Sequence, residues 1–157
     1  MNEELVKQII KSMKKSGLTL SVAESITGGG LAAAITDVAG SSSIFLGGLV
    51  TYSDQSKIKF LDVPKRTLTK ESPVSESVAI LMAENVRKNF GSDYGVATTG
   101  VAGPGKAYGQ SAGRAWIAIA SKKKTISVEL ALSGDREAVR NATIQSALAL
   151  LSRTLLL

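Results

Sequence analysis

Reactive side chains gather in one short stretch of the chain, from Ala23 to Gly30, with the sequence Ala-Glu-Ser-Ile-Thr-Gly-Gly-Gly. It combines a carboxylate, Glu24, with two hydroxyls, Ser25 and Thr27, and it ends in three glycines. A strand-like alternating run precedes it and a helical pattern follows it, so we expect a turn from a strand into a helix. The first N–H groups of a helix lack partners within the helix, and glycines let a ligand approach the backbone. The pattern therefore predicts a site for an anion or a reactive hydroxyl, although a tight connection without a ligand has the same features.

The chain contains no cysteine and no histidine, and this restricts the chemistry of any such site. Thiolate nucleophiles are excluded, and so are the usual general base near neutral pH and the commonest metal ligand. A hydroxyl nucleophile needs a base that takes its proton. A lysine can serve when burial lowers its pKa from about 10.4 toward neutrality. Acid–base chemistry must fall to Asp, Glu, Lys, Tyr or a terminal amine, and the arrangement that we favour is a hydroxyl assisted by a lysine.

Ser25 is the best candidate nucleophile, because it lies at the sharp turn, and Lys57 is the best candidate base, because it follows the end of a strand-like run. Tyr52 could relay a proton or orient the lysine. Backbone N–H groups of Gly28 to Gly30, or of Gly100 and its neighbours, could stabilise a developing oxyanion. Structural alternatives stay open for each side chain: Ser25 as a helix cap, Lys57 as a solvated group and Tyr52 as a packing residue.

Other classes of site find little support in the sequence. Only Glu24, Asp37 and Asp54 lie near the expected site, so no metal is expected, and the glycines lack the Gly-Lys-Ser/Thr ending of a phosphate-binding loop. The net charge of +6 is scattered apart from Lys122 to Lys124, and aromatic residues make up only 4% of the chain. Nucleic-acid binding usually needs a basic stripe with stacking aromatics. We expect attraction for small anions and no nucleic-acid partner; nucleic-acid binding is a hypothesis that rests on charge alone.

The hydrophobic periodicity predicts an α/β protein in which helices separate the first three strands. The expected strands are 18–22, 45–52, 94–99, 113–120 and 125–132. The expected helices are 3–16, 31–38, a short helix after Ser53 that ends at Val63-Pro64, a turn at 65–68, a long helix from Ser75 to about Gly91, and a last helix from Asp135. Parallel pairing through right-handed crossovers then gives a three-layer α/β/α sandwich with a mixed, mostly parallel five-stranded sheet.

Ligands of such sheets bind beyond the carboxyl ends of the parallel strands. Three polar clusters should meet there: Glu24 to Thr27, Thr51 to Ser53 and Thr98 to Gly100. With 157 residues the chain is expected to form a single domain, 1–157. Its acidic start argues against a secretory signal, and its apolar runs are too short to span a bilayer, so the expected location is the cytoplasm.

Several ordered motifs together resemble the C-terminal domain of the competence/damage-inducible CinA family, which includes stand-alone nicotinamide-nucleotide amidases. The resemblance covers nearly the whole chain. The residues that carry it are Ala23 to Gly29, Thr36 to Ser42, Gly48 to Ser53, Lys57, Val74 to Glu76, Thr99 to Pro104, and Gly134-Asp135-Arg136 with Val139-Arg140.

The resemblance implies a metal-free amidohydrolase without a cofactor. It would convert nicotinamide mononucleotide (NMN) to nicotinic acid mononucleotide and ammonia. The family's candidate catalytic positions fall on Ser25, Lys57, Tyr52 and Ser42. Its substrate-binding positions fall on Thr27, Gly28, Gly29, Thr99, Gly100 and Arg140. The substrate's phosphate would fit the helix N-terminus after the glycines and the basic balance of the chain.

The chain departs from the family pattern in two places. Ile26 stands where the family often has cysteine, and the loop Gly105 to Gly113 is shorter and lacks the usual Lys-Pro-Val-Gly-like ending. The altered loop keeps an alternative function open, a non-catalytic module that binds a nucleotide or a protein. The apolar residues Leu155 to Leu157 need cover, so a homo-oligomer is expected, with no membrane partner.

Overall fold

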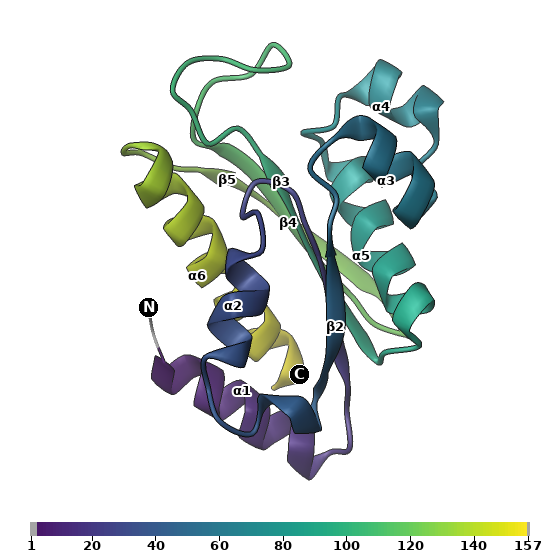
Figure 1. Ribbon diagram of the computed structural model, residues 1–157, viewed down its shortest axis with the longest axis vertical. Coiled ribbons are helices and arrows are strands. Elements are labelled where there is room, and N and C mark those ends of the chain that lie inside the picture. The colour runs from purple at the N-terminus through teal and green to yellow at the C-terminus, as the bar shows by residue number, and fades with distance from the viewer. Residues whose placement is uncertain (1–2, 157) are drawn as a thin grey trace.

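The computed structural model describes residues 3–156, and its centre is a five-stranded sheet in the order β2-β1-β3-β4-β5 (Figure 1). Strand β1 pairs in parallel with β2 and β3, whereas β4 is antiparallel to both β3 and β5. The expected mixed five-stranded sheet is confirmed, but "mostly parallel" is wrong as a description of the pairings. Two of the four strand pairings are parallel and two are antiparallel, because β4 runs antiparallel to both of its neighbours. The strands are β1 (Leu20–Glu24), β2 (Phe45–Val50), β3 (Tyr94–Gly100), β4 (Arg114–Ala120) and β5 (Thr125–Ala131).

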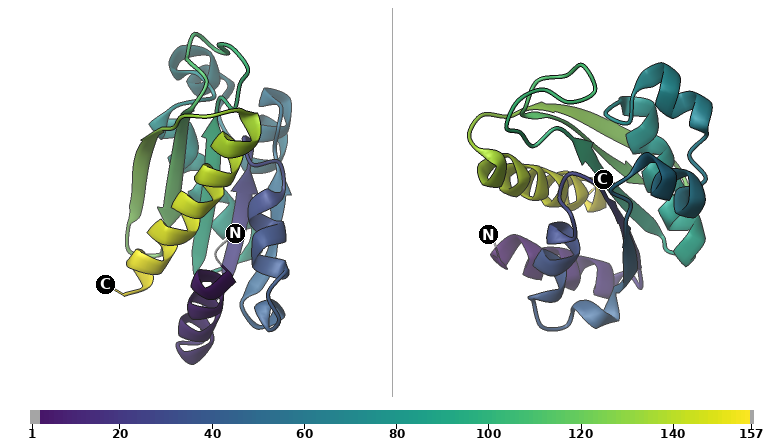
Figure 2. Two further views of the ribbon diagram at one scale, coloured as in Figure 1. Left: turned by 90° about the vertical axis from the view of Figure 1, so that its left-hand side faces the viewer. Right: turned by 45° about the horizontal axis from the view of Figure 1, so that its top comes forward.

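Helices cover both faces of the sheet, which gives the expected three layers (Figures 1 and 2). One face carries α1 (Glu3–Lys15), α2 (Gly30–Thr36) and α6 (Arg136–Leu155), and the other carries α3 (Asp54–Leu61), α4 (Lys65–Glu71) and α5 (Glu76–Phe90). Apolar residues three and four positions apart form the buried stripe of each long helix. In α5 the stripe consists of Val78, Ala79, Met82, Ala83 and Val86.

Strand β1 positions the reactive stretch. Among the strands of residues 3–156 it alone has parallel neighbours on both sides, and all five of its residues are buried. It ends two residues later than the expected 18–22. Ala23 and Glu24 continue the ladder with both neighbouring strands, and so the sequence alternation underestimated its length. Ser25 therefore follows the last strand residue directly. Gly28 and Gly29 then adopt φ of 56° and 96°, a left-handed region that favours glycine, and they turn the chain into α2.

The C-terminal helix ends against the core. Leu155 packs partly buried against it, Leu156 is 81% exposed, and Leu157 lies outside the described residues. The expected self-association through these leucines stays a prediction. Across residues 3–156, no helix combines the length and the apolar character needed to cross a membrane.

Candidate active site

The side chains of Ser25 and Lys57 meet beyond the carboxyl ends of β1 and β2. Ser53 caps α3, accepting from the Ser56 N–H in a capping box, and the helix turns Lys57 back toward the sheet. The Nζ of Lys57 donates to Ser25 Oγ at 3.0 Å and to the Thr51 carbonyl at 2.7 Å. Only 1% of Lys57 and 8% of Ser25 are exposed, so the pair lies largely away from water.

Burial changes the acid–base behaviour of this amine. It lowers the pKa of Lys57 from 10.5 to about 8, because removal from water disfavours the charged form. The carboxylate of Asp54, about one helical turn earlier in α3, acts in the opposite sense and favours the ammonium ion. A lysine with such a pKa can accept a proton near neutral pH, which an ordinary solvated lysine hardly does.

Backbone hydrogen bonds hold Ser25 in place, and its side chain lines a cavity. Its N–H donates to the Thr98 carbonyl at 3.0 Å, and its own carbonyl accepts from Gly28 N at 3.1 Å. The cavity holds about 300 Å³, at the lower end of the range for small-molecule sites. Its lining comprises Ser25, Ile26, Tyr52, Gly100 to Gly105, Ala107, Tyr108 and Arg136.

Tyr52 and Arg136 line the same cavity and contact each other. The Arg136 guanidinium donates to the Tyr52 hydroxyl at 2.9 Å and to the Gly103 carbonyl at 2.7 Å. Tyr52 is 57% exposed, so its ring is a wall of the cavity and not a core residue. The sequence analysis did not place Arg136 in the site. A signal existed: a basic residue at the first position of a helix opposes the helix dipole and therefore suggests another role.

The N-terminus of α2 already holds an anion, the carboxylate of Glu24. It accepts from the N–H groups of Gly29, Leu31 and Ala32 at 3.0, 2.9 and 2.8 Å, and Glu24 is completely buried. The N–H groups of Gly28 and Gly30 donate to backbone carbonyls of the turn. The amides proposed for a phosphate at this helix N-terminus, and for an oxyanion at Gly28 to Gly30, therefore all have hydrogen-bond partners within the chain.

Several residues expected to bind substrate instead form hydrogen bonds within the protein. Thr27 Oγ1 lies 2.7 Å from Thr98 Oγ1, and Arg140 donates to the carbonyls of Ile26 and Thr27 at 3.2 and 2.8 Å. Thr99 Oγ1 donates to the Pro73 carbonyl at 2.7 Å. The structure thus uses Thr27, Thr99 and Arg140 within the protein and does not bring their polar groups into the cavity.

Gly100 does line the cavity, but packing alone requires a glycine there. A Cβ at this position would lie 2.7 Å from both the Ala115 Cβ and the Arg114 carbonyl of β4. The glycine lets the end of β3 approach β4 closely, just where the chain enters the loop around the cavity.

Ser42 is not brought to this site. It lies exposed in a short 3-10 helix, η1 (Ser41–Ser43), which precedes β2, whereas Tyr52 follows β2. A six-residue strand spans roughly 20 Å, and so the two side chains belong to opposite ends of the sheet. Within one copy of the chain, Ser42 has no access to Ser25.

A family model and related sequences all point to one family. A family model described as the CinA C-terminal domain matches residues 2–155. A competence-damage inducible protein of Thermoanaerobacter pseudethanolicus is 43% identical over 155 residues, and a CinA-like protein of Kosmotoga olearia is 41% identical over 155 residues. Each alignment covers 98% of this chain but 38% of the relative, so the chain spans about two fifths of the length of these curated relatives.

Solved structures share the whole architecture. The competence damage-inducible protein A of Klebsiella pneumoniae matches with a TM-score of 0.95 at 34% identity, over 98% of this chain and 96% of that chain. The protein CihA of Agrobacterium tumefaciens matches with a TM-score of 0.94 at 35% identity, over 99% of this chain and 95% of that chain.

Proposed function

The chain belongs to the family of CinA C-terminal domains, and from that premise we propose that it is an amidohydrolase that converts NMN to nicotinic acid mononucleotide and ammonia. The observation that carries this proposal is the contact of 3.0 Å between Lys57 Nζ and Ser25 Oγ in a nearly dry environment. A nucleophile within hydrogen-bond reach of a base with a lowered pKa is the minimal equipment for acyl transfer.

The proposed reaction begins when the neutral amine of Lys57 takes the proton of Ser25. The Ser25 oxygen forms a bond to the carbon of the carboxamide, and the carbonyl oxygen becomes an oxyanion. This tetrahedral species collapses as the carbon–nitrogen bond breaks, and the Lys57 ammonium gives its proton to the amide nitrogen, which leaves as ammonia. Water, deprotonated by Lys57, then cleaves the acyl-serine ester, and the proton returns to Ser25.

Tyr52, Tyr108 and Arg136 contribute polar side chains to the lining of the cavity that contains Ser25. Because the Tyr52 oxygen accepts from Arg136, its own proton is free to be donated to a ligand. Arg136 is the one cationic side chain among the residues described as lining this cavity, and a guanidinium has five N–H donors. We assign the substrate phosphate to Arg136, in place of the N-terminus of α2 that Glu24 occupies.

The test is release of ammonia from NMN by the purified chain. Ser25→Ala and Lys57→Met are expected to abolish it while the melting temperature shows that the fold persists. Thr69→Ala, which alters an exposed hydroxyl in α4, is the matched control and should retain full activity. Absence of ammonia from the intact chain would exclude the amidase. Calorimetric binding of NMN without turnover would then support the alternative, a non-catalytic nucleotide-binding module.

A further inference from the structure

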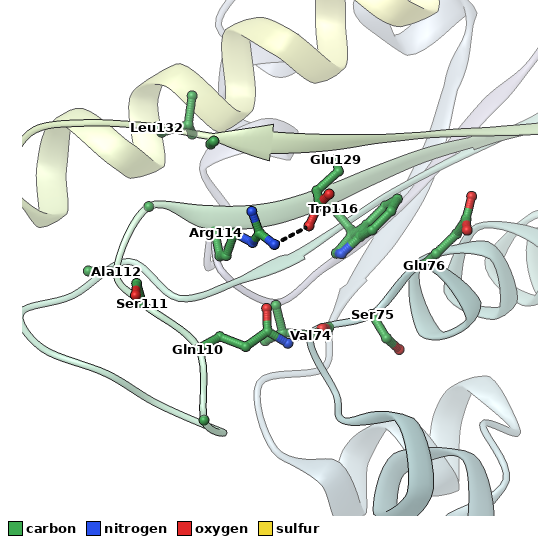
Figure 3. Close-up of a pocket in the computed structure, with 13 residues that line it drawn as sticks. Val74, Ser75, Glu76, Gln110, Ser111, Ala112, Arg114, Trp116, Glu129 and Leu132 are labelled. Atoms are coloured by element: carbon green, nitrogen blue, oxygen red, sulfur yellow. Dashed lines mark hydrogen bonds and ion pairs between the residues drawn. The ribbon is translucent and has the colours of Figure 1, made fainter.

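The loop between β3 and β4, which departs from the family pattern, separates two cavities. Ala107 and Gln110 exchange backbone hydrogen bonds of 3.0 and 2.9 Å around Tyr108 and Gly109, whose positive φ values form a tight turn. Tyr108 lines the cavity of Ser25. Residues Gly109 to Gly113 line a second cavity of about 630 Å³ (Figure 3). Among residues 3–156, none belongs to the lining of both cavities.

The second cavity lies beyond the N-terminal end of α5. The helix begins at Glu76, whose carboxylate accepts from the Ser127 hydroxyl of β5. Beyond that contact the same face of the sheet continues with Trp116 of β4 and its partner Glu129 of β5, and the loop passes over them in place of a helix. The sheet therefore forms a floor with walls on two sides.

The floor and one wall offer complementary hydrogen-bonding groups. Trp116 is half-buried, packs against the core beneath α5, and presents its ring to the cavity (Figure 3). Its indole N–H makes no hydrogen bond to another described residue, so it remains a donor. Gln110 Nε2 donates to the Val74 carbonyl at 2.6 Å, which fixes the amide and leaves Oε1 as an acceptor on the cavity side (Figure 3).

The charges of the lining disfavour an anionic ligand. Arg114 is paired with Glu129 at 3.0 Å, and Glu76 adds a second carboxylate, so one cation faces two anions. A phosphate would meet net negative charge there, whereas a flat uncharged ring could stack on the indole.

We propose that this cavity is a second ligand site, for an uncharged planar heteroaromatic molecule of the size of a nucleobase or nucleoside. The ring stacks on Trp116, and its edge bonds to Gln110. This inference does not depend on the proposed amidase activity. A ligand there contacts the loop whose Tyr108 lines the cavity of Ser25.

Trp116 is the single tryptophan of the chain, so its fluorescence reports on this cavity directly. We would titrate the full chain with adenosine and, separately, with adenosine monophosphate. Adenosine should give a saturable change, and the charged analogue should bind about tenfold more weakly because of the two carboxylates. Gln110→Ala should weaken adenosine binding about five- to tenfold, the effect of one lost hydrogen bond.

Lys106→Ala is the control, because Lys106 belongs to the same loop but lines neither cavity. The affinity of this variant for adenosine should equal that of the native protein. Both Trp116→Phe and Trp116→Ala lack the fluorophore, so calorimetry measures their affinity for adenosine instead. Trp116→Phe keeps an aromatic ring in the floor and Trp116→Ala removes it, so the difference in affinity between the two variants reports stacking. The proposal is overturned by the absence of a saturable change with adenosine, by equal affinity in Gln110→Ala, or by equal binding of the monophosphate.

Discussion

The Nζ of Lys57 lies 3.0 Å from the Oγ of Ser25, although 32 positions separate the two residues in the chain. The parallel pairing of β1 with β2 creates this contact, because it aligns the carboxyl ends of both strands. The Thr51 N–H donates a hydrogen bond to the Glu24 carbonyl at the end of this ladder. The helix α3 then needs less than two turns to return its lysine to the end of β1.

The proposed amidase activity should depend on pH through this lysine. Deprotonated Lys57 is the active form, and its pKa is about 8. We expect kcat/KM for NMN to rise with pH along an acid limb centred near that value and to level off above it. The measurement is the initial rate of ammonia release across pH at low substrate concentration. An acid limb centred near 6, or none, would contradict the assignment of Lys57 as base.

Asp54 should set the position of that limb. Its carboxylate favours the charged form of Lys57, so Asp54→Asn should lower the pKa of Lys57 further and move the acid limb to lower pH. Asp62→Asn is the matched control, because it removes an exposed carboxylate at the other end of α3 at a left-handed position that asparagine tolerates. If the acid limb moved equally in both variants, the shift would reflect the change in net charge and not a specific effect of Asp54 on Lys57.

The buried lysine should also make stability depend on pH. Between about 8 and 10.5 the unfolded chain binds a proton at Lys57 that the folded chain does not, so stability rises with pH through this window. Relative to Lys57→Met, the native protein should gain about 3 kcal/mol of unfolding free energy across it. Denaturant unfolding of both proteins at several pH values measures the difference, in which other titrating groups cancel. A pH-independent difference would mean that the pKa of Lys57 is not lowered.

Arg136 should discriminate between NMN and nicotinamide riboside, which lacks the phosphate. Loss of a charge-assisted contact in Arg136→Ala should raise KM for NMN about tenfold to a hundredfold and leave KM for the riboside nearly unchanged. Lys106→Ala, in the same region but outside the cavity, is the control. If both substrates lose affinity equally, Arg136 acts by holding Tyr52 and Gly103 and not by binding phosphate.

Glu24 should stabilise the turn that carries Ser25. Glu24→Gln retains the shape but turns a carboxylate that accepts three N–H bonds into a neutral group with one acceptor. We expect a loss of about 3 kcal/mol in unfolding free energy. Glu3→Gln, at an exposed position in α1, should change stability by less than about 1 kcal/mol. Equal stability of Glu24→Gln and the native protein would show that solvent can replace the carboxylate.

Periodicity and capping residues were sufficient to predict most of the elements. Ser53, Ser75 and Asp135 each precede a helix and accept a hydrogen bond from its first turn, as their residue types suggested. The convergence of Ser25, Tyr52 and Gly100 on one cavity followed from the rule that parallel strands end at a common edge. These predictions succeeded because they depend on local chemistry and on the direction of strands.

The remaining features depend on competition between groups, which a sequence does not order. Glu24 and a ligand phosphate suit the same helix N-terminus, and only the fold shows that the chain's own carboxylate lies there. The same holds for Arg140, whose guanidinium binds the turn in preference to the cavity. Ser42 is different, because the expected strand 45–52 separates it from Tyr52. The family position and the expected topology therefore disagree in the sequence itself.

The occupied N-terminus of α2 has a consequence for the chemistry of inhibitors. The protein carries its own counter-ion at the turn beside Ser25, and three hydrogen bonds hold it there. Inorganic phosphate and sulfate should therefore not bind at that turn. An inhibitor whose acidic group reaches the turn would be repelled by the Glu24 carboxylate. Compounds that target the serine should carry their acidic group toward Arg136 and present an uncharged face to Ala23 through Gly30.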